Sequence, residues 1–237
     1  MSATPVFKGL IFDLDGTLTD HPSVLGGAFA ECLKKYGKKI SVEEGQRLAK
    51  EMQLQVAGIE STFSYIKVLN KITKEQGIGG FFRRLRFIRN FIKIFHAFTR
   101  KTKMFSGIPE LLQMVHARGM KICIVTSSSR SEVNRSLTEV RDQFDPYVDA
   151  VITRDDIKDV KPNPASLFVV TARFGLEISQ CLVVGDSWHD IRAAKNAGAR
   201  SAAVLWGYGT LENLSAESPD FIVKTPQEIL EILAQKN

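Results

Sequence analysis

Short apolar runs rich in β-branched residues recur along the C-terminal two thirds of the chain. They are KICIVTSS (121–128), DAVIT (149–153), CLVVGDS (181–187), SAAVLW (201–206) and DFIV (220–223), and VFKGLIFDLD (6–15) has the same character. Such runs, bounded by turn residues, are typical of strands that are buried on both faces of a parallel sheet.

Helical patterns separate these runs. PELLQMVHARG (109–119) and PASLFVVTARFG (164–175) each begin with Pro and end with Gly, as helices often do. DIRAAKNAG (190–198) is a short Ala-rich helix, and TPQEILEILAQK (225–236) begins with a capping-box pattern. Alternating strands and helices predict βαβ units. We therefore expect an α/β fold with a Rossmann-like parallel sheet that is covered by helices on both faces.

Residues 20–104 interrupt this alternation. They contain helical patterns, AFAECLKKYG (28–37) and FFRRLRFIRNFIKIFHAF (81–98), and the turn-like GIGG (77–80). We expect an all-helical domain at 20–104, inserted into an α/β core made of residues 1–19 and 105–237.

The composition is that of an ordinary globular protein, with 44% hydrophobic and 24% charged residues in 237. No apolar run approaches the ~20 residues that span a bilayer, and the N-terminus lacks a secretory pattern. The three cysteines, Cys32, Cys123 and Cys181, lack metal-ligand spacing. A cytoplasmic location is expected from these features.

The net charge of +6 is unevenly spread, because no Asp or Glu lies between Glu75 and Glu110 while Arg and Lys are frequent there. A helical wheel of 81–100 predicts a basic amphipathic helix. We expect this helix to pack within the helical domain. Two alternatives are that residues 81–103 make weak contact with an anionic membrane, or that their charge attracts an anionic substrate. Specific nucleic-acid binding is not expected, since no recognition motif is found. The apolar side of the wheel holds Phe81, Leu85, Ile88, Phe91, Ile92, Phe95 and Phe98.

Polar residues follow several of the predicted strands. In a parallel sheet the ligand site lies beyond the carboxyl ends of the strands, so these residues are expected to share one crevice. Crowded carboxylates need a cation, and Mg²⁺ suits oxygen ligands. Taken singly, a strand-end Asp is often only a turn former and a lone Lys is usually solvated. The residues are Asp13, Asp15, Thr126, Ser127, Lys161, Asp186 and Asp190.

The motifs DLDGT (13–17), IVTSS (124–128), VKPNP (160–164) and VVGDSWHD (183–190), in this order, resemble those of the haloacid dehalogenase (HAD) superfamily of phosphohydrolases. The helical insert is similar to that superfamily's C1-type cap domain. The stretch KPNP to WGYG (161–209) resembles the phosphoglycolate phosphatase and β-phosphoglucomutase branch.

The resemblance implies a role for each residue of the site. Asp13 would be the nucleophile that forms an aspartyl-phosphate, and Asp15 would act as general acid and then as general base. Lys161 would neutralise charge on the nucleophile and the phosphoryl group. The other roles implied are phosphate binding by Gly16, Thr126 and Ser127, Mg²⁺ binding by Asp13, Asp15 and Asp186, and support of the metal's surroundings by Asp190.

We predict a Mg²⁺-dependent phosphatase that acts on a small phosphorylated metabolite and resembles phosphoglycolate phosphatase. Asp15 argues against a dehalogenase, because that activity does not use a second aspartate. A β-phosphoglucomutase-like phosphosugar mutase, a phosphonatase with a lysine in the cap domain, and a binding or regulatory protein that acts through the basic cap domain remain alternatives. Both a monomer and a homodimer fit the sequence.

Overall fold

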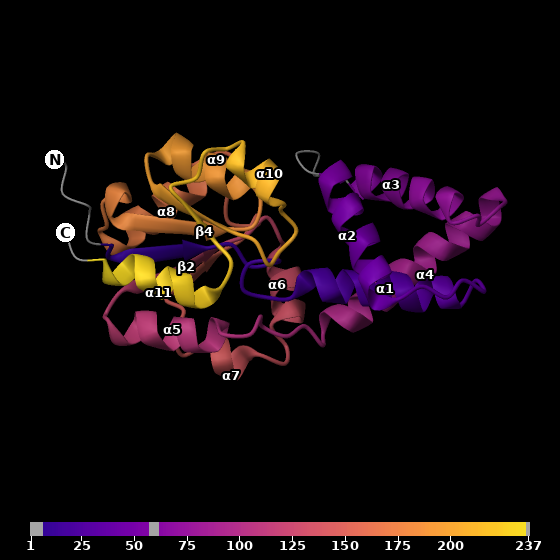
Figure 1. The fold of residues 1–237 in the computed structure, drawn as a ribbon, viewed down its shortest axis with the longest axis horizontal. Coiled ribbons are helices and arrows are strands. Elements are labelled where there is room, and N and C mark those ends of the chain that lie inside the picture. The colour runs from indigo at the N-terminus through magenta and orange to yellow at the C-terminus, as the bar shows by residue number, and fades with distance from the viewer. Residues whose placement is uncertain (1–6, 57–61, 236–237) are drawn as a thin grey trace. The chain divides into compact units, whose positions relative to one another are not determined.

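The computed structural model describes residues 7–56 and 62–235, and contacts between Cα atoms divide the chain into two units. The first unit is Met1–Asp20 with Lys103–Asn237, and the second is His21–Thr102. Figure 1 shows that the first unit holds the sheet and that the second is helical. The sequence had suggested a division at 19/20 and at 104/105.

The first unit is built on a six-stranded sheet in the order β3-β2-β1-β4-β5-β6, with every pair of neighbours parallel. This confirms the α/β fold class. In the register, Phe12 at the end of β1 lies beside Ile124 of β2 and Val184 of β4. The loops that follow these three strands therefore leave the sheet at the same edge. The strands are β1 (Gly9–Phe12), β2 (Lys121–Val125), β3 (Ala150–Ile152), β4 (Cys181–Gly185), β5 (Arg200–Val204) and β6 (Phe221–Val223).

Helices cover both faces of this sheet (Figure 1). One face carries α8 (Ala165–Phe174) and α9 (Trp188–Ala197), and the other carries α5 (Ile108–Ala117) and α11 (Pro226–Ala234). Strand β1 alternates between them, because Leu10 and Phe12 belong to the cluster that contains α5 and α11 side chains, whereas Ile11 belongs to the α8 and α9 cluster. The shorter elements are α6 (Arg130–Ser136), α7 (Arg141–Phe144), η1 (Ile178–Gln180) and α10 (Leu211–Ser215).

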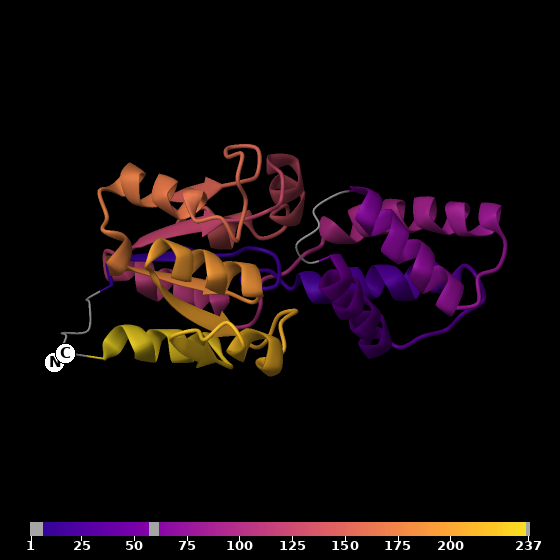
Figure 2. The same cartoon turned by 90° about the horizontal axis from the view of Figure 1, so that it is seen from above.

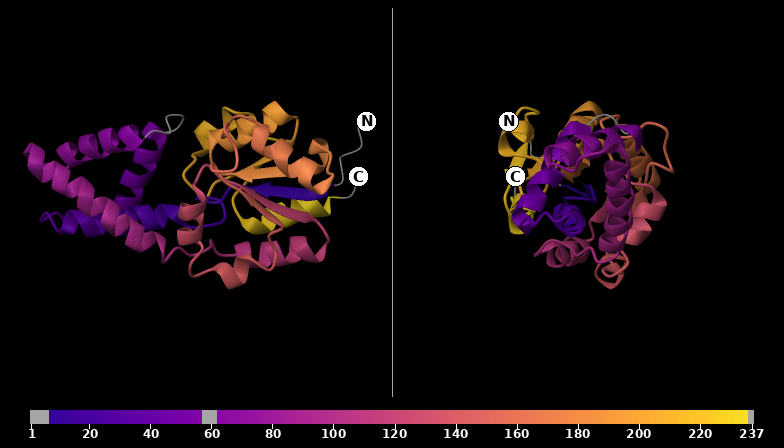
Figure 3. Two further views of the ribbon diagram at one scale, coloured as in Figure 1. Left: turned by 180° about the vertical axis from the view of Figure 1, so that it is seen from behind. Right: turned by 90° about the vertical axis from the view of Figure 1, so that its right-hand side faces the viewer.

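The second unit consists of α1 (His21–Lys34), α2 (Val42–Val56), α3 (Thr62–Glu75) and α4 (Phe81–Thr99). Helix α1 packs against α2 and α4, and α3 packs against the same two helices (Figures 2 and 3). Glycine allows the close approach of α1 and α2, since a Cβ on Gly45 would overlap the backbone of Gly26. The interior holds the rings of Phe29 and Phe91, with centroids 4.5 Å apart.

The apolar face of α4 differs from the expected one. Ile88 and Phe91 are buried, but Phe81, Leu85 and Ile92 are exposed. The buried side of the helix is rotated relative to the wheel, and it includes Phe87, Ile94 and Thr99. None of the helices in the described ranges is long and apolar enough to span a membrane.

Candidate active site

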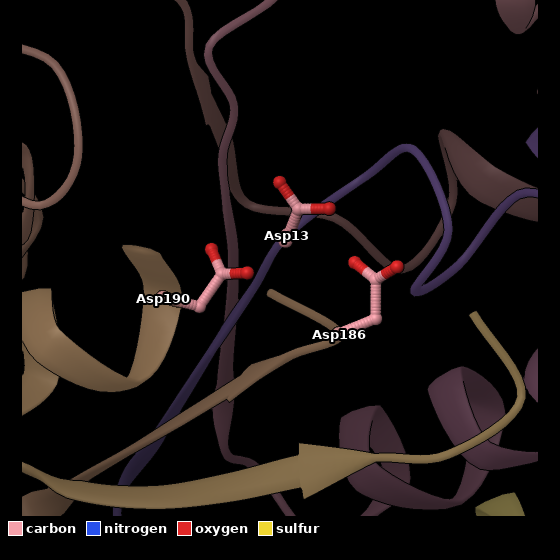
Figure 4. Close-up of side chains that lie close together, drawn as sticks. All are labelled: Asp13, Asp186 and Asp190. Carbon is pink, nitrogen blue, oxygen red and sulfur yellow. The ribbon is translucent and has the colours of Figure 1, made fainter. Parts of the chain in front are cut away.

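Three carboxylates meet at the edge of the sheet where β1 and β4 end. Asp13 directly follows β1, and its N–H donates to the carbonyl of Val184 at 2.9 Å. Asp186 follows β4, and Asp190 lies in the first turn of α9. One carboxylate oxygen from each aspartate lies within 4.8 Å of the others. Figure 4 shows the three carboxyl groups gathered around one space.

Lys161 joins this cluster from the loop before α8. Its Nζ donates to Asp13 Oδ1 at 2.6 Å, to Asp190 Oδ1 at 2.6 Å and to the carbonyl of Val125 at 2.9 Å. All three hydrogens of the ammonium are therefore used. Burial alone would lower the pKa of Lys161, but the charges of Asp13 and Asp190 outweigh it, so the pKa is raised and the side chain stays charged.

Negative charge exceeds positive charge in this buried cluster. Burial raises the pKa of Asp13 well above its usual range; the Lys161 ammonium opposes the rise, while the charges of Asp190 and Asp186 add to it. Burial and the charge of Asp190 raise the pKa of Asp186 to about 7. One ammonium cannot compensate three carboxylates, so the cluster favours either bound protons or a further cation.

The carboxylate of Asp186 is held by groups from two loops. Thr17 Oγ1 donates to Oδ1 at 3.3 Å, and the backbone N–H of Tyr208 donates to Oδ2 at 2.7 Å. The loops can come this close because they carry glycine: a Cβ on Gly16 or on Gly207 would overlap the Asp186 carboxylate. Gly16 also has a φ of 103°, which favours glycine.

Asp190 is fixed through both of its oxygens. Oδ1 accepts from Lys161, and Oδ2 accepts from Ser187 Oγ at 2.6 Å and from Ser187 N at 3.1 Å. These contacts form part of a capping box, which starts α9 at Trp188 rather than at Asp190 as the sequence suggested. The arrangement suits a side chain that positions Lys161.

Asp15 lies close by but contacts other groups. Its Oδ2 accepts from Ser128 Oγ at 2.7 Å, and its Oδ1 accepts from Thr19 Oγ1 at 3.3 Å. Ser128 comes from the loop after β2, so it links that loop to the β1 loop. The carboxyl group of Asp15 is thus oriented by these two hydroxyl groups, and Lys161 donates to other acceptors.

Thr126 and Ser127 lie in the loop after β2. Thr126 N donates to the carbonyl of Ile152 at 3.0 Å, and Thr126 Oγ1 accepts from Ser128 N at 3.0 Å. Thr126 is buried and Ser127 is half-buried. In this structure the Thr126 hydroxyl shapes the loop, and phosphate binding by Thr126 and Ser127 stays a prediction.

Four contributing groups were not among the predicted site residues. Thr17 and Ser128 stand inside the motifs DLDGT and IVTSS, and Ser187 has the pattern of a helix N-cap, with Asp190 three residues later. Their positions in these motifs could therefore have indicated that they belong to the site. Tyr208 contributes a backbone N–H, whose direction depends on the turn after β5, so the identity of its side chain could not have indicated this contact.

The donor set fits a hard divalent cation. The cluster offers carboxylate oxygens and no sulfur or imidazole, which is the ligand chemistry that Mg²⁺ prefers. Asp186 is 2% exposed and Asp190 is 1% exposed, so the residual negative charge is poorly solvated. A cation with a charge of two would compensate the excess that the single lysine leaves.

Comparison with known proteins identifies the family. The model of the haloacid dehalogenase-like hydrolase family matches residues 10–204, which include every carboxylate of the site. The chain belongs to the haloacid dehalogenase-like hydrolases. This confirms the predicted superfamily and the prediction that the protein is an enzyme.

Relatives of this hydrolase match over almost their whole length. The pyrophosphatase PpaX of Bacillus cereus strain AH820 is 30% identical over 96% of this chain and 97% of its own length. The phosphoglycolate phosphatase of Salmonella typhi is 29% identical over 95% of this chain and 92% of its own. The crystal structure of a predicted phosphoglycolate phosphatase from Haemophilus somnus 129PT superimposes with a TM-score of 0.75 at 23% identity, over 95% of this chain and 97% of that one.

Proposed function

We propose that this hydrolase is a Mg²⁺-dependent phosphatase, which cleaves a small-molecule phosphate monoester through an aspartyl-phosphate on Asp13. The observation that carries the proposal is the position of Lys161 Nζ, 2.6 Å from both Asp13 Oδ1 and Asp190 Oδ1 in a buried acidic cluster. A carboxylate flanked by cations can approach an anionic phosphate that would otherwise repel it.

Asp13 has one oxygen for orientation and one for attack. Oδ1 accepts from Lys161, whereas Oδ2 accepts no hydrogen bond from any residue that the structure describes. In the first step Oδ2 forms a bond to phosphorus, and the bond between phosphorus and the ester oxygen breaks. Lys161 stays protonated and neutralises charge on the nucleophile throughout.

Asp15 is the proposed proton donor and acceptor. It gives a proton to the leaving ester oxygen, then takes one from the water that attacks the phosphorus of the intermediate. That second step releases inorganic phosphate and restores the Asp13 carboxylate. The hydrogen bonds from Ser128 and Thr19 hold the Asp15 carboxyl group in place between the two steps.

The side chains of Asp13 and Asp186 and the carbonyl of Asp15 would hold Mg²⁺, with Asp190 positioning its surroundings. When bound, the ion compensates charge on the carboxylates and on the phosphoryl oxygens. Thr17 and the Tyr208 N–H, which orient the Asp186 carboxylate, would act as supports of this site.

Thr126, the Ser127 N–H and Gly16 are the proposed contacts of the remaining phosphoryl oxygens. Thr126 and Ser127 stand at the end of β2, the neighbour of β1, and Gly16 lies in the loop that follows Asp13. A hydroxyl and backbone N–H groups are suitable donors to such oxygens. We place the activity in the cytoplasm, in line with the sequence.

A small phosphorylated acid such as 2-phosphoglycolate is the first substrate to test, because a phosphoglycolate phosphatase is 29% identical over 95% of the chain. Inorganic pyrophosphate is the second, because the 30% identical relative is a pyrophosphatase. Hexose phosphates complete the panel, since a mutase would isomerise them rather than release phosphate.

Phosphate release from this panel and from p-nitrophenyl phosphate, measured with and without Mg²⁺, tests the proposal. We expect release that requires Mg²⁺ and falls by more than about 10³-fold in Asp13→Asn. The exposed Asp142→Asn is the matched control and should keep wild-type activity. Equal inertness of the wild type and Asp13→Asn on every ester would contradict the proposal.

A further inference from the structure

Helix α4 carries an exposed apolar stripe beside its basic residues. Phe81 is 67% exposed, Leu85 54% and Ile92 42%, and steps of four and seven residues return to the same side of a helix. Phe82 is 82% exposed, and its ring meets that of Phe81 edge to face at 5.5 Å. We call Phe81, Phe82, Leu85 and Ile92 the apolar stripe. The buried side of α4 already supplies its packing, so the stripe adds no contact to the interior.

A basic row runs next to this stripe. Arg86, Arg89 and Lys93 follow one another at three and four residues, so they share one exposed side of α4. Within the ranges 7–56 and 62–235 none of the three forms an ion pair with a carboxylate. Arg84, in contrast, donates to Asn70 of α3 at 3.0 Å and is used inside the helical unit. The basic row is therefore available to an external partner.

The surrounding sequence lacks compensating charge. Eight Arg or Lys residues and no Asp or Glu lie between Glu75 and Glu110. A cluster of this kind attracts an anionic surface, with each cation near such a surface contributing about 1 kcal/mol. Long Arg and Lys side chains can also extend to phosphate groups while their aliphatic parts cover apolar surface.

We propose that this face of α4 binds the surface of a bilayer containing anionic phospholipid, with the apolar stripe at the acyl boundary and the basic row at the phosphates. A bilayer uses both features of the face. A nucleic acid would use the basic row alone and would leave Phe82 in water. A second copy of the chain would bring two basic rows together, which like-charge repulsion disfavours.

Co-sedimentation of the full chain with vesicles tests this surface. We expect binding to vesicles of phosphatidylcholine with phosphatidylserine, little binding to phosphatidylcholine alone, and weaker binding at high salt. Arg86→Gln/Arg89→Gln/Lys93→Gln should weaken binding roughly a hundredfold, and Phe81→Ser/Phe82→Ser at least about tenfold. These side chains are exposed, and unchanged thermal midpoints by circular dichroism would show that the variants fold.

Matched variants of the same helical unit serve as controls. Val42→Ser/Leu54→Ser removes apolar side chains that are 53% and 49% exposed, and Lys34→Gln/Lys35→Gln/Lys39→Gln removes three exposed charges. Both controls should bind vesicles as the wild type does.

Three results would contradict the proposal that this face of α4 binds a membrane. The first is no binding of the wild type to anionic vesicles at low salt. The others are an equal loss of vesicle binding in the α4 variants and the control variants, or unchanged vesicle binding in Phe81→Ser/Phe82→Ser. Binding of a DNA or RNA duplex without vesicle binding would assign the basic row to nucleic acid instead. Dimerisation lost in the Phe81→Ser/Phe82→Ser variant, without vesicle binding, would assign the stripe to a second copy.

Discussion

Lys161 Nζ lies 2.6 Å from Asp13 Oδ1, although 148 residues separate the two in the chain. The same nitrogen lies 2.6 Å from Asp190 Oδ1, so one ammonium joins the loop after β1 to the start of α9. We therefore expect Lys161 to contribute both to catalysis and to the stability of the folded protein.

Removing the ammonium should damage activity and stability together. Lys161→Met, which keeps an unbranched apolar chain but lacks the terminal ammonium, should lower phosphate release by about 10²–10³-fold. Without a divalent cation it should also cost about 3–5 kcal/mol in the free energy of unfolding, because buried carboxylates lose their partner. Urea unfolding and p-nitrophenyl phosphate hydrolysis measure the two effects.

The exposed Lys158→Met is the control for that substitution and should change neither quantity. Lys161→Arg provides a second test, since it keeps the charge but its planar guanidinium cannot reproduce the three contacts of Nζ. We expect it to fold more stably than Lys161→Met and to remain poorly active. A Lys161→Met protein with wild-type turnover would contradict the assigned role.

The raised pKa of Asp186 predicts how stability depends on pH when no divalent cation is present. Because this pKa is about 7 in the folded protein and near 3.8 in the unfolded chain, the folded state binds more protons between these values. The free energy of unfolding should therefore fall as pH rises from about 4 to about 7, by at most about 4 kcal/mol from this residue.

Urea unfolding at several pH values, without divalent cation, compares wild type with Asp186→Asn. The difference between the two proteins isolates the contribution of Asp186. We expect a flatter pH dependence in the variant over this interval. Parallel curves for the two proteins would show that Asp186 is ionised throughout.

Gly16 should not tolerate even the smallest side chain. In Gly16→Ala the new Cβ would overlap the Asp186 carboxylate, and the φ of 103° adds backbone strain. We expect a loss of about 2–4 kcal/mol in the free energy of unfolding and a weakened affinity for Mg²⁺. Thermal unfolding with increasing Mg²⁺ measures both.

Gly119→Ala is the control that shows how much of the Gly16→Ala effect comes from backbone strain and how much from the overlap of the new Cβ with Asp186. Gly119 also has a positive φ, of 70°, but nothing lies within 4 Å of its added Cβ. This variant should lose only about 1–2 kcal/mol and keep its response to Mg²⁺. Similar Mg²⁺ affinities for the two variants would rule out a specific role for the space beside Asp186.

Thr17→Val tests a contact that sequence analysis did not single out. The change keeps the shape of the side chain but removes the hydroxyl that donates to Asp186 Oδ1. We expect about 10-fold weaker Mg²⁺ binding, measured as the Mg²⁺ dependence of phosphate release. Thr138→Val is the control, because Thr138 is exposed, lies in the turn after α6, and donates only to the carbonyls of Asn134 and Arg135 in that helix. Equal Mg²⁺ dependence in both variants would contradict a supporting role for Thr17.

The sheet and its main helices could be predicted because local pattern and tertiary environment agree there. The run that contains Ile11 and Phe12 is apolar on both faces, and the structure buries it between two helical layers. The convergence of Asp13 and Asp186 also followed from the topology, since residues after neighbouring parallel strands share one edge of a sheet. Lys161 follows β3, which pairs with β2 and not with β1, so its contact with Asp13 depends on the course of the loop before α8.

The start of α9 and the exposed side of α4 depend on contacts in three dimensions, which the order of apolar and polar residues does not specify. The start of α9 was misplaced because Ser187 caps the helix before the Ala-rich segment begins. The exposed stripe of α4 was missed for a related reason. Its apolar positions cover more than one side of the helix, and only the packing against α1 and α3 decides that Phe87 is buried while Phe81 is exposed.

In the proposed reaction Asp13 carries the phosphoryl group, and Asp15 then activates water. Asp15→Asn with p-nitrophenyl phosphate isolates these steps, because p-nitrophenolate leaves without needing a proton. We predict a burst of p-nitrophenol equal to the enzyme concentration, slow turnover afterwards, and, after acid quenching, a phosphate on Asp13 by peptide mass spectrometry. Turnover of Asp15→Asn at the wild-type rate, or the absence of both the burst and phosphorylated Asp13, would show that the reaction does not pass through these two residues.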